Sequence, residues 1–304
     1  MASISVSVPS EKLAENLADT GAEVVVWKMD GPPPRQVIDI VVPPYMSAGE
    51  GLPLLADVRT RLVQGQSIGY EGTEEKLPAG VVFANASTVH ETSTAELALA
   101  LTLAAQREFV RFVRAQTEGE WSPVRADSLA DRRVLVLGYG GVGKAIAARL
   151  APFEVEIIPV ASTARDEDGV HVHAVGELED LLPTAEIVIT SLPGGESTRH
   201  IIDDAFLASL PDGALVVNVG RGSLVDTDAL VDHVRRGRIR AALDVTEPEP
   251  LPADHPLWTL DGVLIAPHVG GATSAMFPRV ERLIRRQIEH LQRGEEPENV
   301  VIRT

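Results

Sequence analysis

The chain contains no cysteine among its 304 residues. It therefore has no disulfide, no thiolate zinc site and no cysteine nucleophile, and this composition fits the reducing cytoplasm. Any catalysis must use other side chains.

Positive charge is also scarce, because 27 Lys and Arg residues stand against 44 Asp and Glu residues, a formal net charge of −17. Nucleic acids and anionic membrane surfaces both favour basic residues, so the charge argues against either as a partner. We expect the surplus of acid mainly to favour solubility.

Long apolar segments are missing as well. The longest, LALALTLAA at 97–105, is far shorter than the roughly 20 residues that span a bilayer. The start, MASISVSVPSEKL, has neither a basic region nor a continuous apolar region, so we expect no signal peptide. A soluble cytoplasmic protein is the expectation.

Strand-like and helix-like segments alternate along the whole chain, which is typical of α/β folds with parallel sheets. Helical periodicity is present at 10–19 and 52–60. The predicted strands form two series, the first at 4–8, 23–27, 37–42, 61–65 and 81–85, the second at 133–138, 155–160, 186–190, 214–219, 240–245 and 263–268.

Two α/β domains are therefore predicted, connected by the helix after residue 92 and by the one after residue 273. Ser93 and Glu96 have capping-box spacing and start a helix that runs through residue 114. The terminal helix covers 279–294, with Gly294 as its stop. A cleft between two domains is the usual place for a ligand.

The stretch VLVLGYGGVGKAIAARL carries Gly138, Gly140 and Gly143 in G-x-G-x-x-G spacing between a strand and a helix. The first glycine permits a tight turn, the second lets the backbone approach a pyrophosphate, and the third allows close packing of helix and strand. The intervening Tyr139, Gly141 and Val142 belong to the same loop and helix start. We predict a dinucleotide-binding site here.

The next strand, VEIIPV, ends without the acid that usually binds the ribose of NAD. Ala161 stands at its end, followed by Ser162, Thr163 and Arg165. A carboxylate would bind the ribose 2′-hydroxyl and repel the 2′-phosphate of NADP, whereas hydroxyls and a guanidinium can bind that phosphate. NADP(H) is therefore the favoured cofactor, with NAD(H) as the alternative.

Three later strand ends carry the groups for a reaction at a keto acid. Arg221 can bind a carboxylate with two hydrogen bonds, and His268 can exchange a proton with the 2-oxygen. A Glu beside that histidine would favour its protonated ring and hold its orientation.

The stretch HVH at 171–173 has two histidines but no third ligand near in sequence, so we expect a solvent-exposed strand and no metal site.

Four segments resemble the D-isomer-specific 2-hydroxyacid dehydrogenase family. They are the GxGxxG loop, NVGRGSLVDTDAL at 218–230, DVTEPEP at 244–250 and PHVGG at 267–271, in the family's order. The resemblance extends over nearly the whole chain. It implies that Arg221 binds the substrate, that His268 is the acid/base and that Glu249 is its partner, since Glu249 precedes the family's proline at the matching distance from Asp244.

The resemblance also implies the remaining site residues. Asp244 would face the nicotinamide side, and the loop at 66–72 would hold the substrate carboxylate with Ile68 and Gly69 at its centre. Tyr45 also enters the predicted substrate site, although a packed loop tyrosine is the simpler interpretation. Further cofactor contacts are expected at Leu192, Pro193, Thr198, Val219, Gly220 and Gly270.

The family implies a substrate domain split between residues 1–92 and 279–304, around a cofactor domain at 93–278. Its long helix at 93–114 resembles a dimer-forming crossover, so a homodimer is expected. We expect two Rossmann-like or flavodoxin-like domains and reduction of a small 2-keto acid such as glyoxylate or hydroxypyruvate. The alternatives are phosphoglycerate dehydrogenase activity and a corepressor-like protein that binds dinucleotide without turnover.

Overall fold

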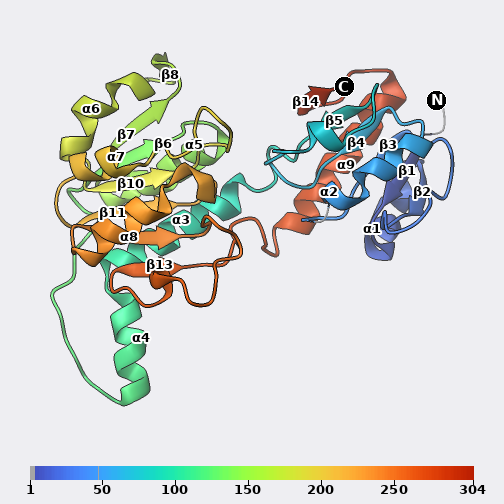
Figure 1. Cartoon of the computed structure of the whole chain (residues 1–304). Helices are drawn as coiled ribbons and strands as arrows, with labels where there is room; N and C mark the ends of the chain where they lie inside the picture. The colour runs from blue at the N-terminus through green and yellow to red at the C-terminus, as the bar shows by residue number, and fades with distance from the viewer. Residues whose placement is uncertain (1–3, 47) are drawn as a thin grey trace. The chain divides into compact units, whose positions relative to one another are not determined.

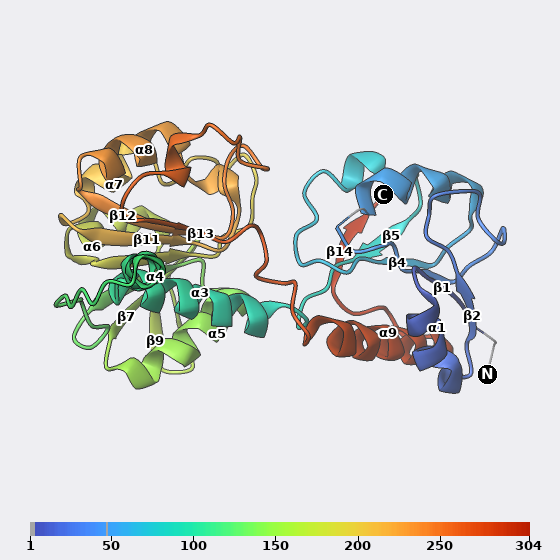
Figure 2. The ribbon, with the colours of Figure 1, turned by 90° about the horizontal axis from the view of Figure 1, so that it is seen from below.

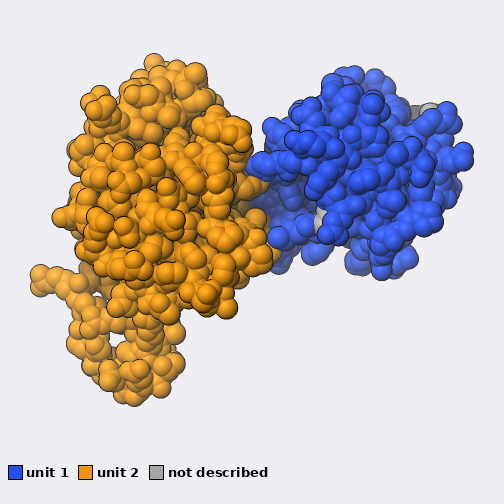
Figure 3. Space-filling view, in the orientation of Figure 1, with its two compact units in different colours: residues 1–90, 273–304 blue, residues 91–272 orange. Residues whose placement is uncertain are grey.

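The computed structural model describes residues 4–46 and 48–304, which form two compact units (Figure 3). Unit 1 comprises residues 1–90 and 273–304, and unit 2 comprises residues 91–272. The chain thus changes unit after residues 90 and 272, where the sequence placed the boundaries at 92 and 278. The second change comes earlier because the last helix begins at Met276, which is buried in unit 1.

Unit 1 is built on a six-stranded sheet in which only the last strand of the chain is antiparallel. All five strands predicted for this region are present. Inner strands such as Leu62–Gln64 are buried on both faces, whereas the edge strand Glu23–Val26 is partly exposed. Across the sheet the strands are β14 (Val300–Arg303), β5 (Val82–Ala84), β4 (Leu62–Gln64), β3 (Ile40–Val41), β1 (Ser5–Val8) and β2 (Glu23–Val26).

Helices cover both faces of this sheet (Figure 2). α1 (Glu11–Leu17) and α9 (Met276–Arg293) share one apolar core with β1. On the other face lie α2 (Ala48–Gly51) and a 3₁₀ helix at Leu52–Asp57. The helix predicted at 52–60 is therefore shorter and more tightly wound, whereas the stop of α9 at Gly294 is confirmed by its left-handed φ of 71°.

Unit 2 is built on an eight-stranded sheet that contains all six strands predicted for it. β8, which pairs antiparallel with β9, is a further strand that the sequence did not predict. Across the sheet the strands are β13 (Val263–Ile265), β12 (Ile239–Leu243), β11 (Ala214–Asn218), β10 (Ile187–Thr190), β6 (Arg133–Leu137), β7 (Glu156–Ala161), β9 (Val170–Ala174) and β8 (Arg165–Glu167).

This sheet is also covered on both faces (Figure 2). In β6, Val134 and Val136 pack on one side and Leu135 and Leu137 on the other, following the two-residue period of a strand. The first side is covered by α3 (Glu91–Gln106) and α5 (Gly141–Leu150), the second by α6 (Leu178–Leu181), α7 (Asp204–Ser209) and α8 (Thr227–Arg235).

The long helix predicted from Ser93 to residue 114 is two helices. α3 begins at Glu91, so Ser93 is buried inside the helix and the predicted capping box is wrong. α3 ends at Gln106, and α4 (Phe109–Glu118) begins after Glu108, whose φ of 57° is left-handed. The sequence has no glycine or proline to mark this break. α4 then extends away from the sheet of unit 2 (Figure 1).

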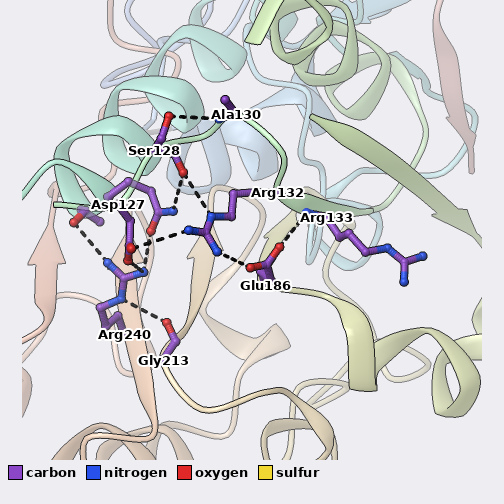
Figure 4. Close-up of polar contacts among 10 residues, drawn as sticks. Asp127, Ser128, Ala130, Arg132, Arg133, Glu186, Gly213 and Arg240 are labelled. Atoms are coloured by element: carbon purple, nitrogen blue, oxygen red, sulfur yellow. Dashed lines mark hydrogen bonds and ion pairs between the residues drawn. The ribbon is translucent and has the colours of Figure 1, made fainter. Parts of the chain in front are cut away.

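A polar network ties the segment after α4 to the amino-terminal edge of the sheet (Figure 4). Arg132, just before β6, hydrogen-bonds Glu186, just before β10, and lies 3.7 Å from Asp127. Asp127 also lies 3.5 Å from Arg240 in β12. The hydrogen bond to Glu186 is the main reason that the pKa of Arg132 is raised. This network anchors the amino-terminal edge of the sheet, while the chemistry predicted above belongs to the opposite edge.

No helix in the described part of the chain has the length and apolar character needed to cross a bilayer.

Candidate active site

The carboxyl-terminal edge of the unit 2 sheet gathers most residues that the sequence singled out. Strands β6, β7 and β10 to β13 are parallel, so all six end at this edge. The chain moves outward from β6 to β7 and later returns to β10 on the other side of β6. Doubly wound sheets bind their ligands at such a reversal of strand order.

The glycine loop follows β6 directly, and its glycines are required for different reasons. Gly138 has a φ of 103°, and a Cβ there would lie 2.9 Å from the backbone nitrogen of Leu192. A Cβ on Gly143 would lie 1.9 Å from the carbonyl oxygen of Gly138. At Gly140, by contrast, a Cβ would meet no heavy atom of the described residues within 4 Å. The space at Gly140 therefore fits the close approach of a ligand such as a pyrophosphate.

The start of α5 adds positive electrostatic potential to this loop. Gly140 is the N-cap, and Gly141 and Val142 form the first turn. Backbone N–H groups in a first turn have no acceptor within the helix, and the helix dipole makes this end positive. Tyr139 is half-buried beside them. The predicted loop thus has the geometry of an anion site at a helix N-terminus.

The end of β7 lacks a carboxylate, as the sequence predicts. The strand ends at Ala161, which is almost fully buried, and Ser162 and Thr163 are exposed directly after it. Both hydroxyls are therefore accessible at the strand end, and Ala161 offers no polar group to a ribose.

Arg165 turns back towards the glycine loop instead of pointing into solvent. Its Nη2 donates a hydrogen bond to the carbonyl of Tyr139 at 3.1 Å, and its Nε donates to Glu167 at 3.0 Å. Lys144 of α5 hydrogen-bonds the other oxygen of Glu167. Lys144 first and Arg165 second lower the pKa of Glu167. Sequence reasoning missed Lys144 and Glu167, because their meeting depends on the unpredicted strand β8.

Loops after β10 and β11 pack against the glycine loop. A Cβ on Gly220 would lie 2.7 Å from the carbonyl oxygen of Leu192, the residue that also restricts Gly138. The hydroxyl of Thr198 donates to the carbonyl of Pro193 at 2.8 Å and closes the loop after β10. Leu192 and Gly220 therefore lie close to the glycine loop, in contact with one another.

Arg221 is carried on a turn that Asn218 shapes. The Asn218 side chain accepts a hydrogen bond from the Gly220 backbone at 3.0 Å and donates one to the Arg221 carbonyl at 2.8 Å. Arg221 itself donates to the Gly220 carbonyl at 2.7 Å, and Val219 is buried beneath the turn. This turn places the guanidinium at the carboxyl-terminal edge of the sheet.

Asp244, at the end of β12, organises the loop that carries His268. Its carboxylate accepts hydrogen bonds from the backbone of Val269 at 2.7 Å and Gly270 at 3.0 Å, and its carbonyl accepts from the His268 backbone at 2.7 Å. A Cβ on Gly270 would approach the carboxylate to 2.8 Å. Burial raises the pKa of Asp244, and the two backbone hydrogen bonds partly oppose this shift. Asp244 thus has an anchoring role that the sequence did not indicate.

His268 and Glu249 are brought together, although 19 residues separate them. His268 Nδ1 lies 2.5 Å from Glu249 Oε1, with the side chains 37% and 40% exposed. A carboxylate at Nδ1 fixes the ring orientation and leaves Nε2 at the opposite end for another partner. This pair can hold and transfer a proton at the accessible edge of the sheet.

Glu247 secures the loop between Asp244 and Glu249. Its carboxylate binds Arg199 at 2.7 Å and His200 at 2.8 Å, and its carbonyl accepts from the Thr227 hydroxyl at 2.7 Å. The hydrogen bond from His200, followed by that from Arg199, lowers the pKa of Glu247. Sequence reasoning missed this group, because the only signal was a second acid in DVTEPEP.

The predicted substrate residues Tyr45, Ile68 and Gly69 belong to unit 1, whereas the catalytic and cofactor residues belong to unit 2. The Ile68 carbonyl accepts a hydrogen bond from the Asn85 side chain at 2.8 Å, which fixes the centre of the 66–72 loop. Tyr45 stacks on His90 with ring centroids 5.8 Å apart and an interplanar angle of 18°. It is therefore packed, in line with the simpler interpretation of this residue.

Comparisons with known proteins point in one direction. Residues 99–270 match the family model described as "D-isomer specific 2-hydroxyacid dehydrogenase, NAD binding domain". A D-3-phosphoglycerate dehydrogenase of Methanocaldococcus jannaschii is 34% identical over 77% of this chain, but the match spans only 45% of that longer protein. A glyoxylate reductase of Korarchaeum cryptofilum is 31% identical over 92% of this chain and 89% of its own length.

A solved structure agrees with this result over the whole chain. It is a D-isomer specific 2-hydroxyacid dehydrogenase from Xanthobacter autotrophicus Py2, in complex with NADPH and MES. The two are 29% identical with a TM-score of 0.84, over 99% of this chain and 98% of the other. The order of the motifs, the two-unit α/β fold and these matches agree. The chain belongs to the D-isomer specific 2-hydroxyacid dehydrogenase family.

Proposed function

We propose that the protein interconverts a small 2-keto acid and its D-2-hydroxy acid, using a nicotinamide dinucleotide. The observation that carries this proposal is the 2.5 Å contact between His268 and Glu249, in the same unit as the glycine loop. The name of the Korarchaeum relative, a glyoxylate reductase, supports a small keto acid. The phosphoglycerate dehydrogenase of Methanocaldococcus makes 3-phosphoglycerate the second substrate to test.

His268 and Arg221 divide the chemistry between them. The bound dinucleotide supplies or accepts the hydride. His268 gives a proton to the 2-oxygen during reduction and takes it back during oxidation, with Glu249 fixing the orientation of the ring. Arg221 binds the substrate carboxylate through its planar guanidinium. Unit 1 would serve as the substrate domain through the backbone of Ile68 and Gly69, with Tyr45 nearby, and unit 2 as the cofactor domain.

The cofactor we propose as preferred is NADPH. Ala161 leaves the ribose 2′-hydroxyl without an acidic partner, while Ser162, Thr163 and Arg165 offer donors to a 2′-phosphate. Arg165 already lies against the glycine loop, and Lys144 adds a second cation. Glu167 binds both cations, so a 2′-phosphate would compete with an anion of the protein itself. NADPH in the Xanthobacter structure supports the same choice.

The assembly we propose is a homodimer formed through α4. This helix extends from unit 2 and exposes Phe109, Phe112 and Val113, and Trp121 after it is 96% exposed (Figure 1). A groove of about 510 Å³ lies between α4 and residues 260–264. A second copy would cover this apolar surface.

The compartment we propose is the cytoplasm, which the absence of cysteine supports.

Absorbance at 340 nm tests the proposed activity directly. Glyoxylate, hydroxypyruvate and the keto acid of 3-phosphoglycerate are each offered with NADPH or NADH. We expect consumption of NADPH with at least one small keto acid, and a loss on the order of 10³-fold in kcat for His268→Asn. Tight dinucleotide binding without turnover of any keto acid would instead favour the corepressor-like alternative.

A further inference from the structure

The hairpin of β8 and β9 lies at one edge of the unit 2 sheet and carries two histidines, His171 and His173, in β9. Successive side chains of a strand alternate between faces. His171 and His173 therefore point the same way, while Val172 between them is fully buried on the other side. The two imidazole rings are in contact, with centroids 4.7 Å apart and an interplanar angle of 86°.

Each histidine is also held by a carboxylate. Asp166 in β8 is the direct partner of His171 in the ladder, and its Oδ1 lies 2.8 Å from His171 Nδ1. Glu177, in the turn after β9, lies 2.9 Å from His173 Nδ1 through one oxygen and accepts the Ala174 backbone N–H through the other. Glu177 is four residues beyond His173, and the turn after β9 brings its carboxylate back to the ring, a contact that the sequence did not predict.

The three side chains are close enough to share one ion. One ligand atom from each of His171, His173 and Glu177 lies within 4.8 Å of the others. Metal–ligand distances of about 2.0–2.1 Å place the ligands of a tetrahedral ion about 3.3 Å apart, so even the most distant pair has to close by no more than about 1.5 Å. His171 and Glu177 are 56% and 42% exposed, so their side chains can rotate this far without moving the core.

We propose that His171, His173 and Glu177 form a site for a divalent first-row transition ion, with zinc as the reference ion. Two imidazoles and a carboxylate suit zinc, nickel or copper, whereas magnesium and calcium prefer oxygen ligands. Asp166 orients His171 from outside the ligand set.

The site is structural in character and does not depend on the proposed function. β8 and β9 form one edge of the sheet, and β13, which precedes His268, forms the other. An ion here would tie β9 to the turn that follows it, and through Asp166 to β8. Turnover does not require it.

Calorimetric titration of the untagged full chain with zinc chloride tests the site. We expect one saturable ion per chain and at least a tenfold weaker affinity for His173→Asn and for Glu177→Gln, with a 10- to 100-fold loss for Asp166→Asn as an orienting residue. His290→Gln is the matched control, because His290 lies 3.2 Å from Glu295 but no second histidine is part of that pair. This variant should bind zinc as the unsubstituted chain does, and magnesium should not compete.

Cobalt(II) gives a second readout, since intense visible bands indicate a four-coordinate ion with protein ligands. We expect these bands in the unsubstituted chain and in His290→Gln, and their loss in His173→Asn, with circular dichroism unchanged. Zinc binding that persists in a His171→Asn and His173→Asn double variant would overturn the proposal, as would the absence of saturable binding below about 100 µM.

Discussion

Arg221 owes its position to backbone contacts. Asn218 fixes the turn, and the guanidinium donates to the adjacent Gly220 carbonyl, a bond that a substrate carboxylate can replace. A planar group with two parallel donors matches a carboxylate, whereas a lysine offers only a point charge.

Arg221→Lys is therefore expected to reduce kcat/KM for a keto acid by roughly 100-fold or more, about 3 kcal/mol of transition-state binding. Dinucleotide affinity, measured by fluorescence titration, should change little, because the substitution leaves the glycine loop intact. Near-normal kcat/KM in this variant would remove Arg221 from the proposed role.

Arg165 and Glu167 together decide the expected cofactor preference. Arg165→Ala removes a charged donor from the 2′-phosphate and should weaken NADPH by about 10- to 100-fold in Kd, leaving NADH almost unchanged. Glu167→Gln removes the competing anion and should strengthen NADPH binding several-fold.

Ala161→Asp should shift the cofactor preference towards NADH, since it adds a partner for the 2′-hydroxyl and repels the 2′-phosphate. Titrations with both cofactors check all three variants.

The sign of the Glu167 effect distinguishes this interpretation from a purely structural one. If Glu167 mainly held Arg165 in place, Glu167→Gln would weaken NADPH instead of strengthening it. A strong NADH preference in the unsubstituted protein would refute the proposed preference, although the family assignment would stand.

At the scale of elements, the loop between β12 and β13 is held in place by the contacts of Glu247. Glu247 is held by Arg199 and His200 on one side and by Thr227 on the other, two residues before Glu249. Within the described part of the chain Glu247 makes no hydrogen bond or ion pair with His268 or Asp244, so we regard it as a positioning residue for Glu249.

Glu247→Gln should lower thermal stability at pH 7 by roughly 2–4 °C, a small effect because the side chain is partly exposed. The folded-state pKa of Glu247 lies below its ordinary value of 4.5. Its contribution is therefore complete above that value and is lost as the pH falls through the lowered pKa. The Tm difference between variant and unsubstituted protein should vanish in acid. Glu196→Gln, at an exposed glutamate, is the control. A Tm difference for Glu247→Gln that does not depend on pH would contradict the proposed role of the Glu247 carboxylate.

The elements also show what the sequence could predict. Largely apolar runs located eleven of the strands, because inner strands of a parallel sheet are buried on both faces. β8 was missed because its sequence, RDE, is polar and is stabilised by pairing with β9. The break at Glu108 and the start of α3 were missed because helix periodicity does not encode a left-handed residue or the burial of Ser93.

The sequence predicted those parts of the candidate site whose residues lie in recognisable motifs. The pairing of Glu249 with His268 followed from the order of the family motifs, and the lack of a carboxylate at the end of β7 followed from Ala161. The roles of Lys144, Glu167 and Glu247 could not be predicted, because each depends on contacts between segments that only the fold brings together.

At the scale of the whole molecule, α4 exposes apolar side chains that do not pack into the core of unit 2. Its groove is lined by charges of both signs, among them Arg111, Arg114, Glu118 and Glu120. A two-fold copy can pair such a surface with itself, which offsets the repulsion between chains of charge −17.

Light scattering of the full chain should therefore give twice the chain mass of 32.5 kDa at micromolar concentration. A Phe112→Asp and Val113→Asp double variant should shift the protein to the monomer, because it buries charge in the apolar contact. Val37→Asp, at an exposed valine of unit 1, is the control and should leave the dimer intact. A monomeric unsubstituted chain, or a dimer that survives the double variant, would exclude α4 as the interface.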